Sequence, residues 1–513
     1  MKPEGTKKHK GQVDNVKTIV ILADSLNRRH LSAYGCDWTI TPNIERLQKK
    51  CVVFDNHWTG SAPCMPARRD ILTGRLHFLE RNWGPIEPFD HTLPHILRQK
   101  GIYSHMVTDH YHYLETGGEN YCQMFNTWEC FRGQERDPWV SRVKHNDVPE
   151  HYGRHSTQYD LNRSRFTRES DYPTPMTLSA AVDWMEENKD ADNYLLFVEA
   201  FDPHEPFDVP EDYLKLYKDD YEGTMYYWPG YNPVDVPADA LEHIRKRYAA
   251  LLTMTDKWIG KMLDVMDKYN MWEDTLVIFT TDHGFMLGEH NYMGKNYMPA
   301  YNEIFHIPLM VHWPGKGSEG QRINALTQNI DILPTVLEYF NIDLAVCKNK
   351  LHGRSLRTLI DQDDDKIRDS VIYGYFGKTV NITDGEYTYF RTFANYDNLP
   401  LNIYTAMPTT MNQYLGIDSI SDMSKIETGR FLKWTEFPVY RLPGEVTRIN
   451  NQVLSYSTNK EYINKNLLFN IVNDYGQCNP INSRELENRY IGMLKKAMES
   501  HDSPEEQYLR LGI

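Results

Sequence analysis

Residues 18–24 read TIVILAD, a short apolar run that ends in an acidic residue. Four further runs of similar character are YSHMVTDH (103–110), YLLFVEAFDPH (194–204), TLVIFTTDH (275–283) and IPLMVHW (307–313). Segments of helical pattern lie between them, for example TPNIERLQKK at 41–50 and a long stretch at 241–268. Short apolar strands that alternate with helices predict βαβ units, and therefore an α/β fold with a large, mostly parallel sheet flanked by helices.

Four of these five runs end in aspartate or histidine. The residues concerned are Asp24, Asp109 with His110, Asp202 with His204, and Asp282 with His283. The carboxyl ends of parallel strands meet at one edge of a sheet, where ligands bind. We therefore expect side chains from four distant segments to converge on one site. The alternative is that each residue simply leads its strand into a loop.

Three of these residues have the chemistry of metal ligands. Asp24, Asp282 and His283 would bring two carboxylates and one imidazole to a point, which suits Ca²⁺, Mg²⁺ or Mn²⁺. Zinc is less favoured, because the sequence has no CxxC pair and no HExxH motif. The competing interpretation is a pair of unrelated carboxylates at strand ends.

Length and net charge indicate the domain organisation and exclude some classes of partner. The 513 residues suffice for one large domain and a smaller one, which we place at 17–370 and 371–513 because the later segment has shorter, strand-like pieces and a final helix, typical of an α+β subdomain. Residues 1–16 form a basic tail that we expect to be disordered. A net charge of −15 argues against a nucleic-acid partner or an anionic membrane surface.

The cysteines and the apolar segments indicate a compartment. Seven cysteines, an odd number without a CxxC pair, argue against a complete disulfide framework. The apolar stretch after the basic tail is short for a secretory signal, and no segment approaches transmembrane length. We therefore expect a cytoplasmic protein.

One cysteine stands in a distinctive context, SAPCMPARRDILTGR at 61–75. Pro66 suits the first turn of a helix and Gly74 suits its end, which places Cys64 at a helix N-terminus. The helix dipole and Arg68 would favour an anion there. The spacing excludes a tyrosine-phosphatase loop, since Asp70 stands where that loop needs arginine. The alternative is a buried structural cysteine.

Cys64-Met65-Pro66-Ala67-Arg68 followed by ILTGR resembles the signature of the type I sulfatases, members of the alkaline phosphatase superfamily. Further motifs that fit the same family in order are TPNIERL (41–47), FDPHEPF (201–207), TTDHGFMLGEHNYMGK (280–295), YNEIFHIPLMV (301–311), DILPT (331–335) and HGRSL (352–356). The resemblance implies an alkaline phosphatase-like fold with a divalent metal, Ca²⁺ before Mg²⁺ or Mn²⁺. It also implies that a formylglycine-generating maturation enzyme converts Cys64 to formylglycine.

The resemblance further implies residue roles. Formylglycine at position 64 would join Asp24, Asp282 and His283 around the metal, and one hydroxyl of its hydrate would attack sulfur. Arg68 matches the arginine that steadies the formylglycine and the metal ligands. Lys295 matches the lysine that holds sulfate oxygens, and His204 matches the histidine that binds sulfate or protonates the leaving alcohol.

Two of the sequence's departures from the family concern the expected site. The first strand usually ends in two acidic residues, but Ser25 follows Asp24, so the metal site has one carboxylate fewer. At 108–112, TDHYH replaces Gly-Lys-Trp-His, which puts Asp109 where a lysine is expected. Either His110 or His112 would then replace the family histidine.

These observations predict a sulfatase that hydrolyses a small-molecule or oligosaccharide sulfate ester. The alternatives are a phosphonate monoester or phosphodiester hydrolase of the same superfamily, and a non-catalytic anion-binding protein with unconverted Cys64. The aromatic and basic stretch 113–175 is our candidate for leaving-group recognition. The sequence also allows an oligomer.

Overall fold

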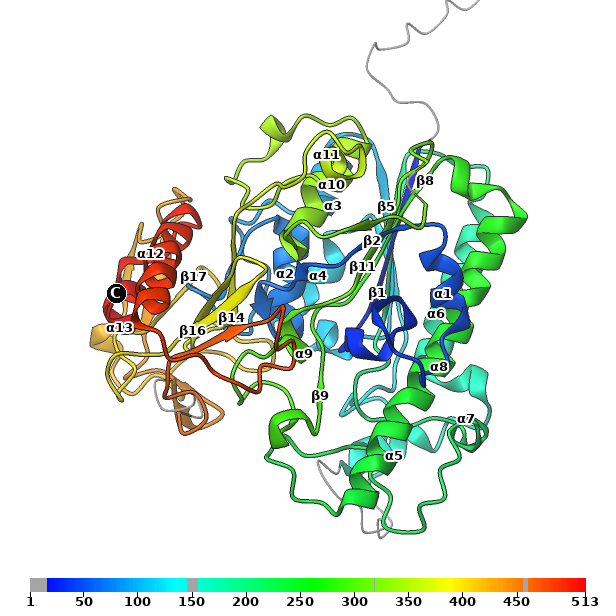
Figure 1. The fold of residues 1–513 in the computed structure, drawn as a ribbon, viewed down its shortest axis with the longest axis horizontal. Coiled ribbons are helices and arrows are strands. Elements are labelled where there is room, and N and C mark those ends of the chain that lie inside the picture. The colour runs from blue at the N-terminus through cyan, green and yellow to red at the C-terminus, as the bar shows by residue number, and fades with distance from the viewer. Residues whose placement is uncertain (1–15, 145–155, 318, 455–459) are drawn as a thin grey trace, which may run out of the picture.

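The computed structural model describes residues 16–144, 156–317, 319–454 and 460–513. Two units lie side by side, a large sheet covered by helices on both faces and a smaller C-terminal part with α12 (Arg484–Ser500) at its edge (Figure 1). The disordered tail predicted for 1–16 lies, apart from Val16, outside the described residues, as does part of the 113–175 stretch.

The large sheet has eight strands in the order β12-β2-β11-β8-β1-β7-β5-β6. Their bounds are β1 (Lys17–Ala23), β2 (Val52–Phe54), β5 (Tyr103–Thr108), β6 (Thr127–Cys130), β7 (Tyr194–Ala200), β8 (Thr275–Thr280), β11 (Leu309–His312) and β12 (Arg322–Ile323). The strands from β8 to β6 are mutually parallel, whereas β11 is antiparallel to both β8 and β2. The mostly parallel sheet predicted from the apolar runs is therefore confirmed.

Helices cover both faces of this sheet because its strands are apolar on both sides. Ile19 and Ile21 of β1 pack into the core shared with α8 (Ala238–Lys268). Val20 and Leu22 face the opposite core, which includes apolar residues of α2 (Cys64–Thr73). Further helices are α1 (Pro42–Gln48) and α6 (Pro173–Glu187) beside α8, and α3 (Leu93–Gln99) and α10 (Ile332–Tyr339) beside α2.

Local sequence accounts for the end of α2, whereas the start of α1 depends on a distant residue. Gly74 ends α2 in a left-handed conformation, with φ 66°, as its place in the sequence predicted. Thr41 stands at the N-cap of α1 but makes no side-chain capping hydrogen bond. Asp256 of α8 takes over that task, accepting bonds from the backbone N–H groups of Asn43 and Ile44. Thr41 is therefore the N-cap by position, while Asp256 supplies the capping hydrogen bonds.

The second sheet has five strands in the order β22-β16-β15-β14-β4. Their bounds are β4 (Ser61–Ala62), β14 (Val371–Tyr375), β15 (Val380–Thr383), β16 (Tyr387–Arg391) and β22 (Leu467–Asn470). Strand β4 pairs in parallel with β14, and α12 contacts β14, β15 and β16. The residues just before Cys64 are thus held by the C-terminal sheet, while α2 packs against the large one.

Shorter elements complete the described part. The strands are β3 (His57–Trp58), β9 (Met286–Leu287), β10 (Met293–Gly294), β13 (Thr327–Gln328), β17 (Asn402–Thr405), β18 (Glu427–Gly429), β19 (Val439–Pro443), β20 (Arg448–Ile449) and β21 (Gln452–Val453). The helices are α4 (Glu119–Gln123), α5 (Thr157–Arg163), α7 (Glu211–Leu216), α9 (Asn302–Phe305), α11 (Arg357–Ile360) and α13 (Glu505–Leu511).

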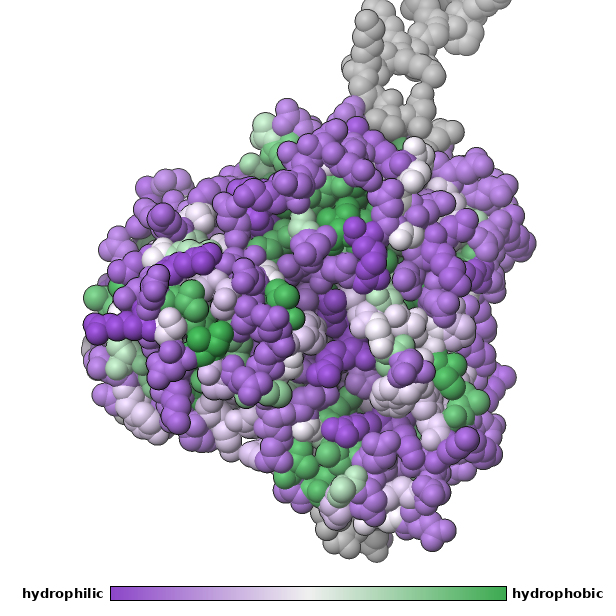
Figure 2. Space-filling model, in the orientation of Figure 1, coloured by the Kyte–Doolittle hydropathy of each residue, from purple (hydrophilic) through white to green (hydrophobic). Residues whose placement is uncertain are grey.

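The surface view in Figure 2 shows a mostly hydrophilic face with smaller hydrophobic areas between polar ones. Among the described residues, no helix combines the length and the hydrophobicity that crossing a bilayer would require.

Candidate functional site

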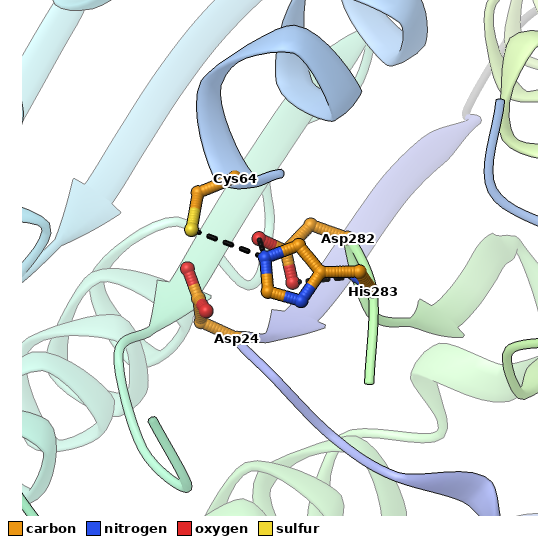
Figure 3. A group of neighbouring side chains, drawn as sticks. All are labelled: Asp24, Cys64, Asp282 and His283. Carbon is orange, nitrogen blue, oxygen red and sulfur yellow. Dashed lines mark hydrogen bonds and ion pairs between the residues drawn. The ribbon is translucent and has the colours of Figure 1, made fainter. Parts of the chain in front are cut away.

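Four side chains meet where β1 and β8 end and α2 begins. Asp24 follows β1, Asp282 and His283 follow β8, and Cys64 is the first residue of α2. One ligand atom from each of the four lies within 4.8 Å of the others, and all four residues are buried. Figure 3 shows these side chains pointing toward one another from three separate segments. Residues more than 200 positions apart in the sequence therefore form one polar cluster.

The approach to Cys64 is fixed by a buried carboxylate. Asp70 of α2 accepts a hydrogen bond from the Ser61 backbone N–H at 2.7 Å and another from the Ser61 hydroxyl at 2.9 Å. These bonds tie strand β4 to the helix that follows it. The turn that places Cys64 at the helix N-terminus is thus fixed by a link between Ser61, which precedes it, and Asp70, which follows it.

Arg68 joins the two aspartates of the cluster. Its guanidinium lies 2.9 Å from Asp24 Oδ2 and 2.6 Å from Asp282 Oδ2, and it also donates to the Cys64 carbonyl at 3.2 Å. All three partners and Arg68 itself are buried. Burial opposes the charge of Arg68, but the surrounding carboxylates outweigh it and raise the pKa well above its ordinary value. Arg68 is therefore a fixed positive charge that orients both aspartates.

A third carboxylate, which sequence reasoning missed, belongs to the same network. Glu199 of β7 accepts a bond from Arg68 Nε at 3.1 Å, from the Tyr113 hydroxyl at 3.0 Å and from the Thr108 hydroxyl at 3.1 Å. Burial raises the pKa of Glu199. The available signal was one charged residue inside the apolar run YLLFVEA, since such a residue is rarely buried without a partner.

Lys295 contacts the cluster through Ser25 and Cys64. Its ammonium lies 2.8 Å from the Ser25 hydroxyl and 3.6 Å from Cys64 Sγ. Ser25 donates in turn to Asp24 Oδ1 at 2.8 Å, and its backbone N–H donates to Asp282 Oδ1 at 3.0 Å. Ser25 has a left-handed backbone, with φ 58°, which is uncommon for residues other than glycine and frequent at functional sites.

The structure distinguishes the positions of His110 and His112. His110 is fully buried, and its Nε2 lies 3.6 Å from Asp24 Oδ2. Neither of its ring nitrogens has a hydrogen-bond partner among the described residues. His112 Nδ1 instead lies 2.6 Å from Glu115, and its ring meets Trp83 edge to face. His110 is therefore the histidine that adjoins the cluster.

His204 lies on the loop after β7 and is also buried. Burial lowers the pKa of its imidazole well below the ordinary value, and the positive charge of Lys295 adds to this effect. Its Nδ1 lies 2.5 Å from the Glu205 carbonyl oxygen. The loop thus presents an imidazole whose pKa is lowered partly by the positive charge of Lys295.

Two strand-end residues do not join this cluster, which corrects the expectation of one shared site. Asp109 accepts bonds from the Phe201 N–H, the Gln134 amide and the Thr174 hydroxyl at 2.7 to 2.8 Å. Gln134 also donates to Asp202 at 3.4 Å. Asp109, which stands at the expected lysine position, is therefore engaged in a separate buried network.

The donor set fits a divalent cation. His283 Nδ1 donates to the Gly284 carbonyl at 2.8 Å, so its Nε2 presents a lone pair toward Cys64, 3.1 Å away. Burial opposes ionisation of Asp24, but Arg68 and Lys295 outweigh it and leave its pKa below the ordinary value. Two carboxylates and one oriented imidazole are ligands that a hard cation accepts.

The thiol of Cys64 does not readily ionise to a thiolate in this environment. Burial raises the pKa of its thiol well above the ordinary value, and the Asp24 carboxylate adds to the effect. The nucleophilic form of cysteine is the thiolate. An unmodified Cys64 is therefore badly suited to attack a substrate.

Two family models match this sequence. The sulfatase family model matches residues 17–342, and the model described as N-sulphoglucosamine sulphohydrolase, C-terminal, matches residues 288–423. An arylsulfatase of Clostridium perfringens is 22% identical over 389 residues, which cover 69% of this chain and 80% of the relative.

Solved structures share the fold over almost the whole chain. A protein solved in complex with its substrate D-glucosamine-2-N,6-O-disulfate is 16% identical, with a TM-score of 0.66 over 96% of this chain and 99% of its own. A phosphonate monoester hydrolase of Agrobacterium radiobacter is 17% identical, with a TM-score of 0.66 over 94% of this chain and 95% of its own. These likenesses establish an alkaline phosphatase-like fold, which confirms the predicted fold class.

Proposed function

Because the chain belongs to the sulfatase family and is a sulfuric ester hydrolase, we propose that it removes sulfate from a sulfated amino sugar through a formylglycine made from Cys64. Support for the sugar comes from the match of residues 288–423 to a family named for N-sulphoglucosamine. The solved neighbour whose substrate is a disulfated glucosamine agrees with this class.

The observation that carries the proposal is the placement of Cys64 among Asp24, Asp282 and His283. Formylglycine at position 64 would supply a hydroxyl of its hydrate as the nucleophile. The buried thiol of unmodified Cys64 is unsuited to that role. A divalent cation held by the same residues, Ca²⁺ in our proposal, would supply positive charge beside the nucleophile and the sulfate. A formylglycine-generating enzyme is the maturation partner that this chemistry requires.

The surrounding side chains have roles that follow from their positions. Arg68 fixes Asp24 and Asp282 in their orientations through two hydrogen bonds of 2.9 and 2.6 Å. Lys295, 3.6 Å from Cys64 Sγ, places its ammonium against a sulfate oxygen, and burial makes this contact strong.

Two histidines complete the site. His110, with no hydrogen-bond partner in the described part of the chain, offers a ring nitrogen to a second sulfate oxygen. His204 gives a proton to the leaving alcohol oxygen.

The competing function is hydrolysis of a phosphonate monoester, because a phosphonate monoester hydrolase shares the fold equally well. The two reactions differ in the charge and geometry of the reacting group, which the fold alone does not select. Residues that contact the oxygens must therefore decide between them.

One experiment tests nucleophile and substrate together. The protein is produced with a formylglycine-generating enzyme, and the tryptic peptide 51–68 is weighed, with Cys51 in that peptide as the unmodified thiol control. Turnover of glucosamine 6-sulfate and of a phenyl phosphonate monoester is then compared. We expect an aldehyde at position 64 and a preference for the sulfate. A thiol at 64, under conditions that convert another sulfatase, or a preference for the phosphonate would contradict the proposal.

A further inference from the structure

Two buried carboxylates flank the imidazole of His204. Glu205 Oε2 lies 3.3 Å and Glu135 Oε1 lies 3.6 Å from His204 Nδ1. Glu135, Glu205 and His204 are each at most 4% exposed. Charged carboxylates are rarely buried without a function or a partner, so this group of two acids and one imidazole requires an explanation.

The contacts define which nitrogen of His204 bears hydrogen. The Glu205 carbonyl oxygen, 2.5 Å from Nδ1, can only accept a hydrogen bond, so Nδ1 is the donor. This leaves Nε2 as the ring nitrogen that can exchange a proton with a substrate. An imidazole held in this way is oriented to pass a proton through Nε2.

Each carboxylate is itself anchored by a tyrosine. The Tyr111 hydroxyl donates to Glu135 Oε2 at 3.1 Å, and the Tyr231 hydroxyl donates to Glu205 Oε1. Glu135 also has a left-handed backbone, with φ 41°, an unfavourable conformation for a residue with a side chain. Such strain persists where surrounding contacts enforce it, and it is frequent at functional sites.

Most of the other charged groups around His204 oppose its protonation. Lys295 and His283 lower the pKa of its imidazole, and His110 would repel it if protonated, whereas the Asp282 carboxylate raises that pKa. Burial disfavours the imidazolium as well. The imidazolium of His204 therefore needs nearby negative charge to be populated.

We propose that the carboxylates of Glu135 and Glu205 are positioning residues: they lie beside the Nδ1–H that the Glu205 carbonyl holds, and their negative charge stabilises the His204 imidazolium for protonation of the leaving alcohol. As the oxygen nucleophile at position 64 bonds to sulfur, the S–O bond to the alcohol breaks, and its electron pair stays on the alcohol oxygen, which takes the proton from Nε2. The neutral imidazole later regains a proton from water. This inference rests on the proposed role of His204.

The test compares leaving groups of different basicity. Glu135→Gln and Glu205→Gln keep the side-chain shape and remove the charge, and the matched control is Glu129→Gln, an exposed glutamate of the same chain segment. A sugar sulfate needs protonation of its alcohol, whereas 4-nitrophenyl sulfate releases a stable anion without it. We expect kcat/KM to fall about 10- to 100-fold for the sugar sulfate but less than about threefold for the nitrophenyl ester.

The pH profile gives a second readout. Removing either carboxylate should move the alkaline limb of kcat/KM for the sugar sulfate to lower pH, and Glu205→Asp should restore part of the loss. An equal loss for both esters with an unchanged pH profile would mean a merely structural role and would overturn the inference. Unfolding temperatures of all variants identify any that are misfolded. If one of Glu135→Gln and Glu205→Gln misfolds, the other still tests the inference.

His204→Asn separates the two levels of the argument. If it loses activity on the sugar sulfate alone while the glutamate variants behave like wild type, the role of His204 stands and the inference about the glutamates fails. If His204→Asn lowers the activity on both esters equally, the proposed role of His204 as proton donor is wrong, and the inference about the glutamates falls with it.

Discussion

The ammonium of Lys295 donates to the hydroxyl of Ser25 across 2.8 Å, although the two residues are 270 positions apart in the sequence. Ser25 links Lys295 to Asp24, because its hydroxyl also donates a hydrogen bond to Asp24 Oδ1. A neutral side chain therefore stands between the lysine and the Asp24 carboxylate, at the position where the resemblance to the sulfatase pattern leads us to expect a second acid. This exchange lowers the negative charge available to a cation.

Restoring the acid should strengthen cation binding. In Ser25→Asp, the added carboxylate increases the negative charge of the ligand set, and aspartate tolerates the left-handed backbone at this position better than most residues. We expect Ca²⁺ to bind the metal-stripped protein roughly tenfold more tightly by calorimetry. Ser25→Ala is the control and should not tighten binding. Equal affinity of Ser25→Asp and wild type would contradict this interpretation of the site.

Removing Arg68 should lower the free energy of unfolding, and bound Ca²⁺ should reduce this loss. Arg68→Met leaves three buried carboxylates without their shared partner, which costs about 3–5 kcal/mol for a broken buried pair. Ca²⁺ would neutralise part of that charge, so the loss should be smaller in its presence. Thermal and denaturant unfolding with and without Ca²⁺ measure both effects.

The matched control for Arg68 is its neighbour. Arg69 is also buried on α2, but it pairs with Asp90, away from the cluster. Arg69→Met should therefore destabilise the protein without any rescue by Ca²⁺. Rescue of both variants, or of neither, would show that the cation does not occupy the Arg68 network.

The two histidines near residue 110 should differ in their effect on catalysis. His110→Ala removes a buried ring 3.6 Å from Asp24, and we expect kcat/KM to fall about 100-fold through loss of a contact to the reacting group. His112→Ala removes a ring already engaged by Glu115 and should cost less than about tenfold. Steady-state kinetics on one sulfate ester decides between them, and a larger loss for His112 would reverse the assignment.

Much of the fold could be predicted from the sequence because its central strands are buried on both faces. Runs such as 18–24 and 275–283 are therefore almost continuously apolar, which identifies them as strands of a covered parallel sheet. The run at 307–313 has the same composition but forms the antiparallel strand β11. An apolar run carries no information about its direction in the sheet, so this reversal was not foreseeable.

The site was only partly predictable for a related reason. Asp24, Asp282 and His283 end two adjacent strands, so topology alone brings them together. Glu199 reaches Arg68 from within a strand, and Glu135 reaches His204 from a segment without periodicity. Their partners depend on strand register and on loop packing, which no local pattern in the sequence records.

Asp109 should make stability depend on pH. Burial raises the pKa of its carboxyl to about 6, above the ordinary 3.8, so folding favours the protonated form. The stability contributed by this group is present at low pH and is lost as pH rises through about 6. Relative to Asp109→Asn, wild type should lose up to about 3 kcal/mol between pH 4 and pH 7. Unfolding of both proteins across this range measures the difference. A difference that stays constant, or grows as pH falls, would mean that Asp109 is already ionised at pH 4 in the folded protein.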